Sequence, residues 1–222
     1  MGNRIDPWRL FHIANFYTDL TLKMFGGTKK DASHDIGDIE NHELDARIEV
    51  KGRSNKHLLN IFSNQLTQAI DGKGFGFHNH VYAIYSYRNS WRNSSRRLTN
   101  MAKSREEMDE FLAKNTIHLF FVDADVLAAI REERGLRYAR RAGEDAPIIN
   151  MSKRVLLFFI QKPKETLQKY GLKNFRVFLR GESLIFRDHK ISFLAIFVLR
   201  QGLMKKLLSN CQAVLFPQIN CR

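Results

Sequence analysis

The chain has 222 residues, which fits one domain of ordinary size or a core domain with an appended piece. Hydrophobic residues make up 44% and charged residues 27%, values that exclude a disordered or fibrous protein. The 36 Lys and Arg against 23 Asp and Glu give a formal charge of +13, which favours a polyanionic partner, nucleic acid first. Charge alone is equally compatible with a solvated basic surface.

The sequence predicts neither a structural zinc site nor a membrane span. The two cysteines, Cys211 and Cys221, form no short pair beside histidines that would supply four zinc ligands. The start of the chain lacks an apolar signal core, and the longest apolar run, Phe193 to Leu199, is far shorter than the ~20 residues that span a bilayer. We therefore expect an intracellular, cytoplasmic protein that makes no membrane contact.

In the first half of the chain, helical and extended patterns follow one another. Apolar and charged residues alternate strictly from Ala46 to Lys51, the two-residue period of a strand with two different faces. The patterns predict, in chain order, a helix over 7–24, a short strand over 36–40, a strand over 46–51 and a helix over 58–71.

The second half continues the same alternation up to about residue 134. The patterns predict a strand over 80–87, a helix opening at Ser104, a strand over 117–122 and a helix capped by Asp123 or Asp125. Three later apolar segments, 155–160, 175–179 and 191–199, fit strands and buried helix pieces equally well. The order predicts an α/β fold with a mixed central sheet flanked by helices.

The domain organisation follows from where the pattern weakens. Residues 1–150 are predicted to form the core, and residues 151–222 a C-terminal extension. That extension fits an accessory domain, a dimerisation element or further core, and the sequence does not choose among them.

One segment carries a pattern of chemical interest. Glu49 and Lys51 point to the same side of their strand because the side-chain period is two. A turn centred on residues 42–44 would put Asp38 across the hairpin from the neighbourhood of Glu49, close enough for two carboxylates to share one cation. Oxygen ligands in that number suit Mg²⁺ or Mn²⁺. Taken alone, Glu-x-Lys is a weak pattern that also fits a solvent-facing pair.

Asp38 followed by Glu49-Val50-Lys51 resembles the PD-(D/E)XK nuclease superfamily, in which an acid at the end of one strand precedes an acid-x-lysine on the next. The resemblance spans roughly residues 7–130 and departs from the family pattern at Gly37, where a proline gives the family its name. It implies a restriction-endonuclease-like core.

The same resemblance implies roles for individual residues. Asp38, Glu49 and the Val50 carbonyl would bind Mg²⁺, with Mn²⁺ as a substitute, and Lys51 would act on the attacking water and the phosphate charge. Gln65, on the following helix, has a residue type that some branches use beside the site. The activity implied is that of an endonuclease of restriction, junction-resolving or repair type, with DNA as the expected substrate and a homodimer as a possible assembly.

Several alternatives stay open at this stage. Asp35, Glu40 or Asp45 lies near enough in sequence to replace Asp38 as the leading acid. The same site would serve an RNA endonuclease, and a noncatalytic, basic nucleic-acid-binding module with a decayed site is the alternative outside enzymes.

Basic residues interleaved with an aromatic one predict where nucleic acid binds. Arginines beside a tryptophan suit backbone phosphates and base stacking, although a solvated basic loop fits nearly as well. The residues of this stretch are Arg88, Trp91, Arg92, Arg96 and Arg97. The secondary candidates are an arginine stripe over 131–141, His12 as an added metal ligand, and the pair His78 and His80, each of which also has an ordinary structural interpretation.

Overall fold

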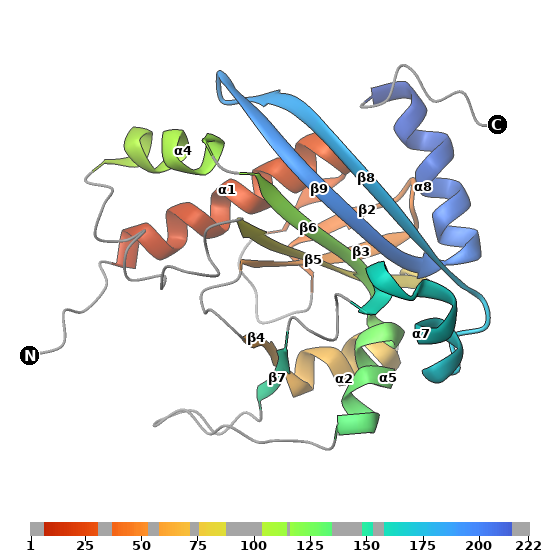
Figure 1. Ribbon diagram of the computed structural model, residues 1–222. Coiled ribbons are helices and arrows are strands. Elements are labelled where there is room, and N and C mark those ends of the chain that lie inside the picture. Colours follow the sequence, from red (N-terminus) through yellow and green to blue (C-terminus); the bar gives the residue numbers. More distant parts are fainter. Residues whose placement is uncertain are drawn as a thin grey trace, which may run out of the picture.

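The computed structural model describes residues 7–30, 37–52, 58–71, 76–87, 104–114, 116–134, 148–152 and 158–214. Its centre is a seven-stranded mixed sheet (Figure 1). The strands of this sheet are β1 (Thr28–Lys29), β2 (Ile39–Asn41), β3 (Ala46–Gly52), β5 (Asn79–Tyr87), β6 (Ile117–Asp123), β8 (Phe175–Phe186) and β9 (His189–Arg200). Their spatial order is β1-β2-β3-β5-β6-β9-β8.

The seven-stranded sheet combines antiparallel and parallel strand pairs. β3 pairs antiparallel with β2 and parallel with β5, and β6 pairs antiparallel with β5 and parallel with β9. β8 and β9 form a long hairpin at one edge. β8 and β9, from the predicted C-terminal extension, therefore lie in the same sheet as strands of residues 1–150.

Helices cover both faces of the sheet (Figure 1). One face packs against α1 (Pro7–Phe25) and α8 (Gln201–Val214), with α4 (Arg105–Ala113) beside α1. The other face packs against α2 (Ser63–Asp71), α5 (Ala124–Arg134) and α7 (Pro163–Lys169). The predicted α/β class with a mixed sheet between helices is confirmed. Among the described residues, no helix combines the length and apolar character needed to cross a membrane.

One segment differs from the sequence-based expectation, and the structure decides segments that the sequence left open. The helix predicted over 58–71 begins only at Ser63, because residues 58–62 form β4 (Leu58–Phe62), which pairs antiparallel with β7 (Ile148–Ser152). Its apolar residues fit either period, and pairing with a segment distant in sequence decides the outcome. Of the three segments left open, the first is helical at 158–161, whereas the other two lie in β8 and β9.

Two glycines, Gly26 and Gly27, link α1 to β1, the edge strand that pairs with β2. Gly27 has a φ of +102°, and a Cβ atom there would lie 2.6 Å from the Glu40 carbonyl oxygen and 2.9 Å from Ile39 Cγ2. Gly26 also has a positive φ, of +73°, but a Cβ atom there would meet nothing within 4 Å. Both positions need a conformation that glycine adopts easily, and Gly27 also needs the space.

We expect Gly27→Ala to lower the free energy of unfolding by roughly 3 kcal/mol, because backbone strain and a clash with backbone atoms of β2 add together. Gly26→Ala, the matched control, should cost only about 1 kcal/mol, the cost of the left-handed conformation alone. Urea unfolding of the two variants measures the difference. Equal stability of the two variants would show that β1 moves away from β2 without cost.

Candidate functional site

The β2–β3 hairpin brings Asp38 and Glu49 to the same place. Its register pairs Ile39 with Ile48 and Glu40 with Arg47, and extending it by one residue sets Asp38 opposite Glu49. The turn occupies residues 42–45, as the predicted turn requires. Alternation along β3 sends Ile48 into the core under α1 and Glu49 to the opposite face, which α2 and α5 cover.

Two crossed hydrogen bonds hold the carboxylates. The Gly37 N–H donates to Glu49 Oε2 over 2.8 Å, and the Val50 N–H donates to Asp38 Oδ2 over 2.6 Å. Each acid is thus fixed to the backbone of the segment that carries the other. The N–H and C=O of one residue point to the same edge of an extended strand, so the Val50 carbonyl is directed to the edge of β3 where Asp38 lies.

Gly37 has a local role that a proline could not fill. Its φ of +98° lies in the left-handed region, whereas a proline ring fixes φ near −65°. Proline also lacks the N–H that Gly37 donates to Glu49. A proline at this position would therefore remove the hydrogen bond to the carboxylate of Glu49.

Lys51 completes the cluster from the same face of β3. Its Nζ atom forms an ion pair with Glu49 Oε1, so both oxygens of that carboxylate have protein partners. The Glu49 residue is 4% exposed, and Lys51 is partly exposed. A buried carboxylate with a charged lysine and a backbone N–H is held in one orientation.

The negative charge of the pair is only partly compensated. Burial, and next the charge of Glu49, raise the pKa of Asp38 to about 6, while the Val50 N–H and the charges of Lys51 and Lys29 act in the opposite direction. Ionised Asp38 is therefore an unfavourable state of the folded protein. A cation placed between the two carboxylates would relieve that cost.

The structure separates Asp38 from two of the alternative acids. Asp45 lies in the hairpin turn and accepts a bond from His78 Nδ1 over 2.7 Å, away from Glu49. Glu40 forms ion pairs with Lys30 and Arg47. Asp35 lies outside the described residues.

The few oxygen donors at this site suit Mg²⁺ or Mn²⁺, which keep waters as ligands, better than they suit a metal that is coordinated by protein side chains alone. Within the described residues, no three His, Cys, Asp or Glu side chains gather closely enough to hold a metal ion. Asp38 and Glu49 supply two carboxylates, and the Val50 carbonyl is a third oxygen on the same edge. Mg²⁺ commonly binds to proteins through one or two carboxylates and keeps several waters.

The side chains of several other candidates from the sequence lie outside the described part of the structure. Gln65 lies in α2, on the same face of the sheet as Glu49, but its side chain is outside the described part of the structure. The whole basic stretch lies outside it too, namely Arg88, Trp91, Arg92, Arg96 and Arg97. Of the arginine stripe, only the backbone of 131–134 is described, as the end of α5.

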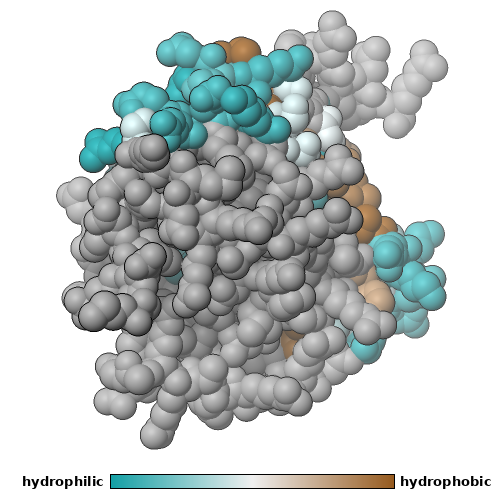
Figure 2. Space-filling view, turned by 60° about the vertical axis from the view of Figure 1, so that its left-hand side comes forward, coloured by the Kyte–Doolittle hydropathy of each residue, from teal (hydrophilic) through white to brown (hydrophobic). Residues whose placement is uncertain are grey.

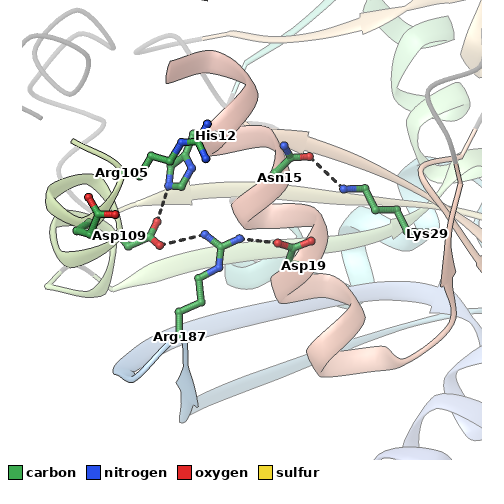
Figure 3. A pocket seen from close by; sticks show the side chains of 8 residues that line it. His12, Asn15, Asp19, Lys29, Arg105, Asp109 and Arg187 are labelled. Atoms are coloured by element: carbon green, nitrogen blue, oxygen red, sulfur yellow. Dashed lines mark hydrogen bonds and ion pairs between the residues drawn. The ribbon is translucent and has the colours of Figure 1, made fainter. Parts of the chain in front are cut away.

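A cavity of about 680 Å³ lies where α1, α4 and the β8–β9 turn meet (Figure 3). Arg187 bridges Asp109 over 3.0 Å and Asp19 over 2.5 Å, and His12 contacts the other oxygen of Asp109 over 2.7 Å. His12 therefore belongs to this network. Figure 2 shows hydrophilic side chains gathered at the top of the face on view, where Figure 1 has α4 and the hairpin turn. Sequence reasoning missed the network because its residues come from three distant elements.

A second, smaller cavity of about 310 Å³ lies beside α5. Its polar wall includes Asp123, Asp125 and Arg200, in which the arginine forms ion pairs with both acids. Burial raises the pKa of Asp123 to about 6. The Asp125 N–H donates to Asp123 Oδ1 over 3.0 Å, which makes Asp123 the cap of α5, as the sequence pattern allows.

The arrangement of Asp38, Glu49 and Lys51 is the feature of the molecule with the clearest chemical meaning. No family model matches the chain, and no curated protein and no solved structure matches it either. The geometry and charge of the site are therefore what bear on its function.

The Asp38 carboxylate should destabilise the metal-free protein at neutral pH. Since its folded pKa of about 6 lies above the ordinary 3.8, the folded state binds the proton more tightly, and stability falls as the pH rises from about 4 to about 6. Asp38→Asn removes this term. In EDTA, the variant should gain stability relative to the wild type across that pH range and remain more stable at pH 7. A stability difference that does not change with pH would contradict the account.

Proposed function

We propose that the chain is a Mg²⁺-dependent nuclease that hydrolyses phosphodiester bonds, with DNA as the substrate to test first. The observation that carries the proposal is the pair of crossed hydrogen bonds that sets the Asp38 and Glu49 carboxylates together beside Lys51. A solvent-facing Glu-x-Lys pair needs no second carboxylate, and burying two carboxylates together lowers stability unless a cation joins them.

The order of elements supports a restriction-endonuclease-like core for this proposal. A helix, α1, precedes the β2–β3 hairpin, and α2 then leads to β5, which lies parallel to β3. Asp38 directly precedes the first strand of the hairpin, and Glu49 and Lys51 lie on the second. This is the placement that the resemblance to the PD-(D/E)XK superfamily implies.

In the proposed site, each residue has a distinct task. Asp38, Glu49 and the Val50 carbonyl would hold the cation. Bound Mg²⁺ would supply Lewis-acid activation of the scissile phosphate. Lys51 orients the attacking water and offsets charge that develops on the phosphoryl oxygens. Gly37 positions Glu49 through its N–H.

The net charge of +13 supports a polyanionic substrate, because cationic side chains neutralise phosphates and release counterions. This part of the proposal concerns affinity. The choice of DNA over RNA comes from the resemblance alone.

We expect Glu49→Ala or Lys51→Ala to reduce cleavage at least ~10²-fold, while affinity for the same substrate in Ca²⁺ stays nearly unchanged. The reason is that these groups act on charge that develops during the reaction, whereas basic residues over the surface supply most of the binding. Ca²⁺ occupies carboxylate sites without the strict octahedral geometry of Mg²⁺. Cleavage of linear, branched and single-stranded DNA and of RNA, with Mg²⁺ or Mn²⁺, measures the first effect.

The matched control is Glu43→Ala, which removes an exposed acid from the turn of the same hairpin and should alter neither quantity. Wild-type protein that binds nucleic acid but cleaves none of these forms would replace the nuclease with a noncatalytic binding module. Equal cleavage by wild type and both site variants would assign the activity to another site.

The basic stretch gives an independent prediction about affinity. The double variant Arg96→Ala/Arg97→Ala should bind all nucleic acid sequences more weakly and reduce the slope of log affinity against log salt by about 2. Both effects follow from the loss of two phosphate contacts. An unchanged salt slope would assign the stretch to a solvated loop without contact to the substrate.

A further inference from the structure

Tyr82 is the residue of β5 that lies beside Glu49. The parallel register of β3 and β5 pairs Glu49 with Tyr82, and both side chains lie on the face of the sheet that α2 and α5 cover. Residues in register on neighbouring strands have side chains about 5 Å apart at their bases.

The Tyr82 hydroxyl group is buried without a hydrogen-bond partner in the described part of the chain. The residue is 1% exposed, and its oxygen is among the few buried side-chain polar atoms that lack a partner there. A buried hydroxyl group without a partner destabilises the fold, and such groups are rare unless a ligand, an ion or water completes them. Because Tyr82 lies beside Glu49, we expect the partner to be a water molecule of the proposed cation site.

Tyr85 provides the contrast within the same strand. It is also fully buried, but on the opposite face of the sheet, where its hydroxyl group shares a 2.7 Å hydrogen bond with Thr21 Oγ1. Its ring stacks on Tyr17 at 4.7 Å between centroids. Tyr85 is therefore satisfied within the protein, whereas Tyr82 is not satisfied by any described residue.

The hydroxyl group of Tyr82 stays protonated over the working pH range. Burial, and next the charge of Glu49, raise its pKa far above the ordinary value. A neutral phenol both donates and accepts a hydrogen bond. It can therefore bind a water molecule beside a carboxylate without adding charge to the site.

We propose that Tyr82 is a positioning residue of the Asp38–Glu49 site, whose hydroxyl group is the protein partner of a water molecule that the bound cation brings in beside Glu49. This proposal rests on the proposed metal-dependent function. Mg²⁺ and Mn²⁺ keep several waters when they bind, and partners around the ligands of a metal typically change its affinity 10- to 100-fold.

The test compares Tyr82→Phe with Tyr85→Phe, two changes that each remove one buried oxygen and keep the ring. Chelator-treated protein is titrated with MnCl₂ by calorimetry, and thermal unfolding is followed with EDTA or with MnCl₂. Tyr82→Phe should bind Mn²⁺ about tenfold more weakly. In EDTA, its melting temperature should equal or exceed that of the wild type, since no protein hydrogen bond is lost. Tyr85→Phe should melt lower in EDTA, because it loses the bond to Thr21, and should bind Mn²⁺ like the wild type.

Wild-type affinity for Mn²⁺ in Tyr82→Phe would overturn the role of Tyr82, provided that Asp38→Asn loses Mn²⁺ binding. A melting temperature of Tyr82→Phe in EDTA as low as that of Tyr85→Phe would also overturn it, because the hydroxyl group would then have a partner in the chain. If the wild type itself binds no Mn²⁺, the proposed metal site fails, and the role of Tyr82 fails with it.

Discussion

The crossed hydrogen bonds at the open end of the β2–β3 hairpin are the constraint on which the candidate site depends. The ladder between the two strands stops at Ile39 and Ile48, and beyond it carboxylates take the place of strand carbonyls as acceptors. Bonds from backbone N–H groups to carboxylates are among the stronger hydrogen bonds in proteins. The positions of both acids therefore follow from the backbone, and side-chain freedom contributes little.

The carboxylate pairs Asp123–Asp125 and Asp38–Glu49 differ in how far neighbouring cations compensate their negative charge. Asp123 and Asp125 share Arg200, which forms ion pairs with both acids. At the hairpin, Lys51 forms an ion pair with Glu49, while Asp38 accepts the Val50 N–H bond and its pKa stays raised despite the charges of Lys51 and Lys29. The first pair has the character of a structural clamp at the start of α5. The second leaves a partly buried excess of negative charge that suits a cation.

Local patterns predicted the hairpin well, because alternation and a nearby turn determine its register. The prediction was wrong at residues 58–62, because these residues form a strand by pairing with β7, which is distant in sequence. The role of Gly37 could not be predicted either, because the sequence determines neither its φ of +98° nor the direction of its N–H. The Arg187 network joins three elements and leaves no sequence signal.

The position of bound Mn²⁺ tests the account most directly. A crystal of the protein soaked in Mn²⁺ locates the ion by its anomalous scattering. The proposed site predicts a peak within coordination distance of carboxylate oxygens of both Asp38 and Glu49, at about 2.2 Å as for similar hard cations. A well-ordered crystal in which both carboxylates are clearly defined, but in which Mn²⁺ binds elsewhere or not at all, would contradict the account.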